Sequence, residues 1–508
     1  MASEIDIANR IPITGALMLA TLMNTLDSTI ANVALPHMQG SLSASQDQAV
    51  WVLTSYILAT AIMTPLSGWL SLKIGRKPMF LISISAFTLA SMACGLAQNL
   101  PEMVIFRLLQ GLAGASLMPL SQTTMLDIYP QKQIPQVMSI WSAVVIMGPI
   151  IGPALGGFLT ENFSWRWVFF VNLPVGILAF LGIYLFMAKD GGGKQRPFDF
   201  LGFGALVAFV GAFQLMTDRG PDKDWFSSRE IWIEAIIAAV GFWVFIVQTI
   251  TAKNPFFHRD LVKDRNFVVC STFGLFVGAL LFSTTALLPS FMQNLMGFSV
   301  LQSGYASMPR GAGSLIAFLI VPFLIPAIGP RRVLMIGIML AAIALWQMAH
   351  FDLSMTADPI MSSGVIQGLG VGLLFAPLNS LAYVSLNPIH RTEATIVNTM
   401  VRSIGSSVGI SLIQATLTHN SAMAHARLAE KIVGGDPVSA ATLPAFMSPA
   451  TEGGLLVLNG EITRQAAMLA YDSIFAWMAL GVLFLAPFLL LMRPPGAVVS
   501  MAVEAHAD

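Results

Sequence analysis

Residues 147–157 read MGPIIGPALGG, and this stretch decides the fold. Its small residues repeat every four positions, with Gly148, Gly152 and Gly156 in one row, Pro149 and Pro153 in the next, and Gly157 at the end. Each proline removes a backbone donor and each interior glycine costs ~1 kcal/mol, so this pattern would break a helix in water. The stretch nevertheless lies in an apolar run from about residue 137 to 159. We therefore predict a membrane helix packed closely on a neighbour, because small residues let two backbones approach.

The composition of the whole chain agrees with a membrane protein. Of the 508 residues, 56% are hydrophobic and 10% are charged, and the mean hydropathy is +0.75. Soluble globular domains carry ~25% charged residues, so this chain has too few charges to cover a water-exposed surface. Its net charge is zero, which gives no electrostatic basis for a nucleic-acid partner. Cys94 and Cys270 lie in apolar runs and are interpreted as buried small side chains rather than as a disulfide or metal pair.

The apolar runs predict an all-α polytopic membrane protein. A spanning helix needs ~20 largely apolar residues. Fourteen such runs lie near 12–35, 49–71, 79–99, 103–126, 137–159, 166–188, 199–217, 231–251, 267–290, 302–326, 332–350, 359–383, 394–418 and 467–491. The first run follows acidic residues and is too long for a cleaved signal peptide. The outer loop near 418–466 is long, and its SAMAHARLAEKI segment is expected to form a short surface helix.

The loop charges predict the orientation of the chain in the membrane. Sixteen lysines and arginines fall on the side of the N-terminus and seven fall on the other side. Cytoplasmic loops carry the excess of positive residues, so both termini are expected in the cytoplasm.

A weak internal repeat divides the chain. LLQGLAGASLMPLS (108–121) resembles VIQGLGVGLLFAPLNS (365–380), which places Gln110 and Gln367 257 residues apart. GRK at 75–77 and GPRR at 329–332 have nearly the same offset. Paired halves around a central cavity are typical of transporters. We predict an N-terminal six-helix half at 1–190, two inserted helices at 191–260, a C-terminal six-helix half at 261–495 and a cytoplasmic tail at 496–508.

Asp27 lies well inside the first apolar run, in LMNTLDSTIANVALP. A bare carboxylate in the hydrocarbon costs several kcal/mol, so this one is expected to be paired, or protonated for part of the time. Asn24 and Ser28 lie within one helical turn of it and add a small polar face. We predict that Asp27 carries a proton, and the alternative is a hydrogen-bonded clamp between helices.

Arg107 begins the pattern RLLQGLAG in the fourth run, at a depth comparable with that of Asp27. Arginine stays charged, so at this depth it must face a cavity or a partner. Pairing with Asp27 would favour the ionised carboxylate and separation would favour its protonated form, so helix motion would switch the proton. Gln110 lies on the same helix face and would bridge the two. The alternative is an Arg107 side chain that merely reaches the outer interface.

The second half contains two further intramembrane cations, Arg310 and Arg402, and Arg402 begins the small-residue pattern RSIGSSVG. Either would contact substrate or lock the two halves together. With Asn24 and Gln367 they are the candidate residues of a central substrate cavity. Three buried arginines against one acid favour a cavity for neutral or weakly acidic compounds.

The segment GWLSLKIGRKP joins the second and third runs. The positive charges of this cytoplasmic turn are explained in part by the positive-inside rule alone. The more specific hypothesis is that the turn acts as a gate, with candidate residues Gly68, Lys73, Gly75, Arg76 and Lys77. The sequence contains no Walker loop, no zinc-ligand spacing and no nucleophile elbow. We therefore predict a secondary transporter rather than an enzyme, with no metal site and no cofactor, that uses the proton gradient as its energy source.

Together these motifs resemble the major facilitator superfamily, and specifically the fourteen-helix drug:proton antiporters of the EmrB/QacA type. The helix 5 pattern GPxxGPxxGG is matched at 148–157, LDxTIxNVALP in helix 1 at 26–36, and RxxQG in helix 4 at 107–111. DRGPDKDWFSSREI (218–231) is similar to the EmrB branch. Two positions depart from the pattern. Leu72 replaces the acid of loop 2–3, and Glu393 only marks the inner end of helix 13, where QacA-like members place acids deeper.

The resemblance implies a proton-coupled efflux transporter that exports amphipathic toxic compounds through a bacterial inner membrane by alternating access. EmrB-like members work with a periplasmic adaptor (a membrane fusion protein) and an outer-membrane channel, so the loops near 218–231 and 418–466 are expected to meet an adaptor. The glycine stripe of 148–156 is expected to slide against the C-terminal half. The alternatives are a dedicated exporter of one metabolite, such as a siderophore or fatty acid, and a non-transporting membrane sensor or scaffold.

Overall fold

The computed structural model describes residues 8–49, 51–189, 197–384, 386–430, 444–447 and 451–492, and within these ranges every regular element is helical. The expected cytoplasmic tail at 496–508 lies outside the described residues, as do parts of the inserted segment (191–196) and of the long outer loop (431–443 and 448–450).

The first half consists of long helices, two of which are interrupted: α2 (Arg10–Ser41), α3 (Gln46–Ala49), α4 (Trp51–Ile74), α5 (Arg76–Leu96), α6 (Leu100–Gly114), α7 (Leu117–Ile128), η1 (Gln131–Gln133), α8 (Ile134–Asn162), α9 (Trp167–Phe170) and α10 (Asn172–Phe186). The inserted pair is α11 (Phe200–Arg219) and α12 (Arg229–Thr251), joined by η2 (Pro221–Lys223) and η3 (Trp225–Ser227). The second half follows with α13 (Asp260–Lys263), α14 (Arg265–Ser290), η4 (Phe291–Leu295), α15 (Val300–Ile328), α16 (Pro330–Met348), α17 (Asp358–Val384), η5 (Pro388–His390), α18 (Arg391–Glu430), η6 (Ala445–Met447), α20 (Glu452–Leu483) and η7 (Ala486–Leu491).

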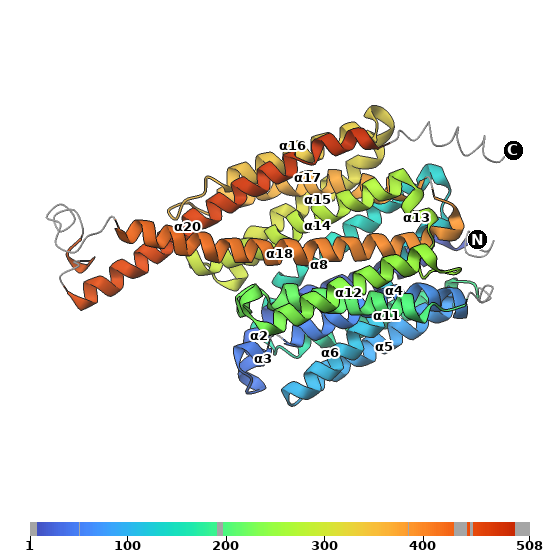
Figure 1. Ribbon diagram of the computed structural model, residues 1–508, viewed down its shortest axis with the longest axis horizontal. Helices are drawn as coiled ribbons and strands as arrows, with labels where there is room; N and C mark the ends of the chain where they lie inside the picture. The colour runs from blue at the N-terminus through green and yellow to red at the C-terminus, as the bar shows by residue number, and fades with distance from the viewer. Residues whose placement is uncertain are drawn as a thin grey trace.

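The long helices run side by side along the longest axis of the molecule (Figure 1). We call the end at which α2 begins the terminal end. Contacts place the end of α10 there, because Asn9 Nδ2 donates to Phe186 O at 3.4 Å. The opposite end is called the hairpin end, since α18 and α20 extend beyond the other helices there (Figure 1).

Thirteen of the described helices are long and apolar enough to cross a membrane, one fewer than the fourteen runs predicted. The helix outside that set is α2, which has a polar middle section around Asn24, Asp27 and Thr29. Its 32 residues nevertheless extend ~48 Å, and it packs against α8 and α10 inside the bundle. The polar section is therefore buried against protein rather than against lipid, as a membrane helix requires.

The two halves pack their helices in the same pattern. The pairs α2–α8, α4–α6 and α5–α10 in the first half correspond to α14–α18, α15–α17 and α16–α20 in the second. Gly75 before α5 (φ 93°, ψ 159°) and Gly329 before α16 (φ 82°, ψ 152°) share a conformation that glycine adopts most easily. The weak sequence repeat is therefore a repeat of geometry, and α11 and α12 pair with each other beside α4 and α18.

Helix α8 continues without a break through Pro149 and Pro153. Its glycine stripe faces α2, where a Cβ on Gly152 would collide with Thr29 and one on Gly156 would lie 2.9 Å from Ile30 Cγ1. The Thr29 hydroxyl also donates to Gly148 O at 3.1 Å.

The expected sliding contact of this stripe with the C-terminal half is therefore wrong. A four-residue repeat shows that some helix approaches closely, but it does not say which helix. The second half contacts a neighbouring face of α8, where a Cβ on Gly311 of α15 would lie 2.7 Å from Ile150 and one on Gly304 would lie 3.6 Å from Ala154.

Helix α18 is far longer than the predicted span at 394–418. Its 40 residues extend ~60 Å, about twice the ~30 Å hydrocarbon core. The SAMAHARLAE part of the expected separate surface helix continues α18 instead, because no glycine or proline interrupts the chain between Gly409 and Glu430, and Lys431 and Ile432 lie outside the described residues. α20 runs back along it, with a hydrogen bond between His425 Nε2 and Asn459 Oδ1 at 3.1 Å.

Candidate functional site

The residues predicted to couple protons meet in a sealed cluster between α2 and α6. The Asp27 side chain has no exposed surface. Its Oδ2 accepts a hydrogen bond from Arg107 Nη1 at 2.7 Å, and its Oδ1 accepts one from Gln110 Nε2 at 2.8 Å. Arg107 Nη1 also donates to Gln110 Oε1 at 2.8 Å, so the three side chains close a ring.

Arg107 is held on every side by the first half. Its Nε donates to Val52 O at 3.1 Å, and its guanidinium lies 4.3 Å from the ring centroid of Tyr56 and 5.6 Å from that of Phe169. The side chain is 1% exposed. The alternative in which Arg107 reaches the outer interface therefore does not hold, and the cation instead balances the buried carboxylate.

Asn172 is a member of this cluster that the sequence interpretation missed. Its Nδ2 donates to Asp27 Oδ1 at 2.8 Å and to Ser91 Oγ at 2.9 Å. The residue begins α10, just after the break that separates this helix from α9. The available signal was a lone amide side chain in the apolar run WVFFVNLP.

Three donors converge on one carboxylate in this conformation. Arg107, Gln110 and Asn172 all donate to Asp27 oxygens, and hydrogen bonds to an ionised acceptor are the strong ones. Breaking a buried ion pair by removing one partner costs ~3–5 kcal/mol, so the cluster opposes any separation of α2, α6 and α10.

The four residues predicted to line a substrate cavity are not gathered in one place. Arg402 contacts the opposite half through Nη2, which lies 3.5 Å from Met118 Sδ of α7. Within its own half, its guanidinium lies 5.0 Å from the ring centroid of Phe375. Asn24 stays within the first half, where its Nδ2 donates to Tyr56 OH and Gly114 O at 3.2 Å each.

Arg310 and Gln367 lie on α15 and α17, which pack against each other and also contact α8 of the first half. Gln367 is 1% exposed, and Gly364, one turn before it, would place a Cβ 3.6 Å from Arg310 Cβ. The Arg402 side chain is thus placed at the contact between the halves by its approach to Met118.

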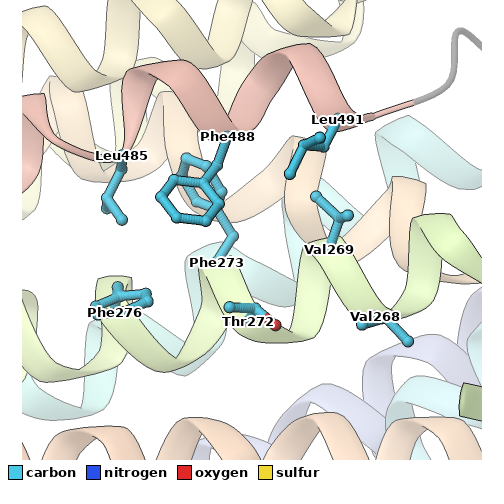
Figure 2. Close-up of a pocket in the computed structure, with 8 residues that line it drawn as sticks. All are labelled: Val268, Val269, Thr272, Phe273, Phe276, Leu485, Phe488 and Leu491. Atoms are coloured by element: carbon cyan, nitrogen blue, oxygen red, sulfur yellow. The ribbon is translucent and has the colours of Figure 1, made fainter.

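A cavity of about 180 Å³ lies elsewhere, between α14 and the segment at 485–491. Figure 2 shows Leu485, Phe488 and Leu491 pointing from this segment toward α14. The remaining lining residues are Val268, Val269, Thr272, Phe273 and Phe276. The cavity is therefore almost wholly apolar, and it lies within the second half rather than between the halves.

An ion-pair network joins the two halves at the terminal end. Asp127 lies at the end of α7, where its Oδ2 accepts from Arg76 Nη2 at 2.6 Å and its Oδ1 from Arg391 Nη1 at 3.2 Å. Arg391 is the first residue of α18 and also donates to Leu126 O at 3.0 Å. Nearby, the hydroxyls of Thr123 and Thr395 lie 2.6 Å apart across the same boundary.

The structure distributes the predicted gating residues over different contacts. Arg76 joins the Asp127 network, and Gly68 packs against Ile396 of α18. Lys73 lies 4.8 Å from the Trp69 ring centroid, and Lys77 Nζ donates to Tyr184 O at 2.8 Å, within the first half.

Leu72 stands where the family resemblance leads us to expect an acid, and the carboxylate in this network is that of Asp127. Sequence interpretation missed both Asp127 and Arg391. The signals were an acid at the last turn of the fourth span and an arginine at the first turn of the thirteenth.

We expect an Arg391→Ala variant to open the terminal end more readily. Removing one partner of this nearly buried pair should cost ~1–3 kcal/mol of contact between the halves. The measurement is disulfide formation between cysteines introduced at Thr123 and Thr395, in a chain whose native Cys94 and Cys270 are replaced by alanine. Crosslinking should be several-fold slower with Arg391→Ala and unchanged with Arg427→Ala, which lies on the projecting part of α18. Equal rates in all three proteins would show that the network does not hold this end closed.

The comparisons with known proteins agree with this architecture. The chain matches the Major Facilitator Superfamily over residues 17–410. It is 34% identical over 501 residues to the multidrug export protein EmrB of Escherichia coli (strain K12), covering 96% of each chain. It is 32% identical over 499 residues to the fatty acid resistance protein FarB of Neisseria gonorrhoeae, covering 95% of this chain and 96% of FarB.

Among solved structures, the fold is similar to that of the human organic anion transporter MFSD10, with a TM-score of 0.60 and 14% sequence identity. The alignment covers 93% of this chain and 99% of that chain. At this identity the likeness concerns the fold alone. The family match over most of the chain and the full-length relatives carry the assignment: this polytopic membrane protein belongs to the Major Facilitator Superfamily and is of the EmrB type.

Proposed function

We propose that this protein is a proton-coupled multidrug efflux transporter, a secondary carrier of a bacterial inner membrane that works by alternating access. The proposal rests on the buried cluster around Asp27, because an acidic side chain sealed in a membrane bundle is costly without a function. It is supported by full-length similarity to proteins named for multidrug export. The fold provides two matched halves, which is the architecture of secondary carriers.

The proposed cycle exchanges a proton for a substrate at alternate sides of the membrane. In the conformation described, the Asp127 network closes the terminal end and three donors bind the Asp27 carboxylate. We assign the terminal end to the cytoplasm, since Arg76, Lys77 and Arg391 lie there in accord with the positive-inside rule. Movement of α6 relative to α2 would separate Arg107 from Asp27 and allow the carboxylate to take up a proton from the outer side.

The proposed substrates are amphipathic compounds that enter between the halves. Arg402 is buried at this boundary beside Met118 and Phe375, so it offers one cation within an apolar and polarisable surface. Such a site suits neutral or weakly acidic molecules better than dications.

A dedicated exporter of fatty acids is the second candidate, favoured by the similarity to FarB. Both functions use the same fold, and they differ in the range of substrates. A carboxylate would pair with Arg402, whereas a set of unrelated drugs would share only the apolar surface.

The test is a substrate panel in a host that lacks its own efflux pumps, followed by transport into inverted vesicles with an imposed pH gradient. Multidrug export predicts raised tolerance to several chemically unrelated compounds, and a dedicated exporter predicts raised tolerance to fatty acids alone. A sensor or scaffold would raise tolerance to none of these compounds. If no compound accumulates in the vesicles under the imposed pH gradient, the protein is not a proton-coupled transporter of the compounds tested.

We further propose that the hairpin of α18 and α20 contacts a periplasmic adaptor, which would link the protein to an outer-membrane channel. The two helices extend well beyond the length needed to cross a bilayer. The first turns of α20 expose apolar side chains there, with Leu456 75%, Leu455 49% and Val457 44% exposed. A group of exposed apolar residues outside the membrane is typical of a protein contact.

We expect a photo-crosslinking amino acid at Leu456 to capture a membrane fusion protein in the native cells. The same probe at Ile389, which is 77% exposed at the terminal end, is the matched control and should capture no such protein. Capture of the adaptor from both positions, or from neither, would argue against a docking role for the hairpin.

A further inference from the structure

Two of the chain's seven histidines meet at the terminal end, far from the Asp27 cluster. His258 lies in the linker that follows α12, and His390 is the last residue of η5, directly before α18. Their rings are stacked, with centroids 4.3 Å apart and planes inclined by 28°. Asp260 joins them, with its Oδ2 3.0 Å from His258 Nδ1.

We propose that His258, Asp260 and His390 form a binding site for a divalent transition metal ion. One ligand atom from each side chain lies within 4.8 Å of the other two. Zinc is bound by imidazole nitrogen and carboxylate oxygen at ~2.0–2.2 Å, which places tetrahedral ligands ~3.4 Å apart. Small rotations of the three partly exposed side chains would bring their ligand atoms from within 4.8 Å to ~3.4 Å of one another. Water would complete the coordination shell of the metal.

The chemistry of the donors selects the class of metal. Two imidazoles and one carboxylate suit Zn²⁺, Co²⁺, Ni²⁺ or Cu²⁺, whereas Mg²⁺ and Ca²⁺ require a shell of oxygen atoms. Lys263 Nζ binds Asp260 Oδ1 at 3.2 Å, which leaves Oδ2 directed at His258.

The backbone around the site is already fixed. His258 N donates to Glu393 Oε2 at 2.8 Å, so α18 holds the linker in place from its first turn. Arg259, between two of the ligands, points away and donates to Thr249 O and Ala252 O. A bound metal would therefore tie the linker at 252–264 to the first turn of α18 without a rearrangement of the backbone.

The expected absence of a metal site rested on the spacing of residues along the sequence. The two histidines are separated by 132 positions, so no short motif contains them. The site depends on the fold, which brings the linker of the inserted helices onto the start of α18.

The test is titration of the full chain in detergent, without a polyhistidine tag, with Co²⁺ as a spectroscopic probe and Zn²⁺ as a competitor. We expect one saturable visible absorption band that Zn²⁺ removes. His258→Ala and His390→Ala should each weaken binding at least about tenfold, since even a lost outer-shell partner costs 10- to 100-fold. His425→Ala, at the hairpin end, should bind as the unaltered protein does, and His258→Gln provides a milder change if alanine impairs folding.

A second readout needs no spectroscopic band. Zn²⁺ should slow tryptic cleavage after Arg259 in the unaltered chain, and not in the His390→Ala variant. No saturable binding, binding that survives both alanine variants, or binding that is lost equally with His425→Ala would overturn the proposal. Cleavage after Arg259 that Zn²⁺ does not slow would overturn the bridging of linker and α18.

Discussion

An Asp27→Asn protein is expected to lose gradient-driven efflux entirely, down to the rate of vesicles whose proton gradient has been collapsed. Asparagine keeps the size of the side chain and one acceptor oxygen for Arg107, Gln110 or Asn172. It cannot take up or release a proton near neutral pH. The measurement is substrate accumulation in inverted vesicles at several imposed pH gradients, compared with substrate binding to the purified protein.

The matched control for this substitution is Asp218→Asn. Asp218 is also an acid in a long apolar helix, where its Oδ1 accepts from Gln214 Nε2 at 2.9 Å, but it lies on the inserted α11. This variant should retain both transport and its pH dependence. If Asp27→Asn also transports normally, the cluster is a structural clamp between α2, α6 and α10 and the proton-carrier assignment is wrong.

A Gly152→Leu protein is expected to fail in transport and to lose thermal stability. A Cβ at this position already collides with Thr29 Oγ1 and lies 3.4 Å from Ile30 N, so a leucine side chain must push α8 away from α2. Overpacking a close contact typically costs ~1–3 kcal/mol. Because α2 carries Asp27, the same displacement would disturb the donors around the carboxylate. Thermal unfolding in detergent and vesicle transport measure the two effects.

Two further variants locate the cause of this loss. Gly15→Leu, in α2, adds the same side chain at a position where a Cβ would have no atom within 4 Å, and it should be tolerated. The double variant Gly152→Ala with Thr29→Ala should recover stability that Gly152→Ala alone loses. If the double variant does not recover thermal stability, and Gly15→Leu loses as much stability as Gly152→Leu, then the close contact between the glycine stripe and α2 is not the cause of the loss.

The features that local chemistry dictates could be read from the sequence. Apolar runs fixed the number of long helices to within one, because crossing a bilayer sets a minimum length and hydropathy. Asp27 and Arg107 could be paired in advance, since each is too costly in hydrocarbon without the other. The offset between Gln110 and Gln367 reflected a repeated packing of helices.

The features that depend on which helices are neighbours could not be read in this way. The glycine stripe indicated close packing but not that α2 is the partner. Asp127 and Arg391 are ordinary helix-end charges until the fold brings them within 3.2 Å. The projecting part of α18 is polar enough for water, so a search for apolar runs ended the helix early. Asn172 was missed because a single amide in an apolar run has many possible partners.

Proton release on substrate binding tests the central claim most directly. The purified protein, in weakly buffered detergent solution with a pH indicator, receives a substrate identified in the panel. If Asp27 exchanges its proton for substrate, the unaltered protein and Asp218→Asn should release protons, while Asp27→Asn should bind substrate and release none. Equal release from Asp27→Asn would contradict this mechanism and place the proton on another group.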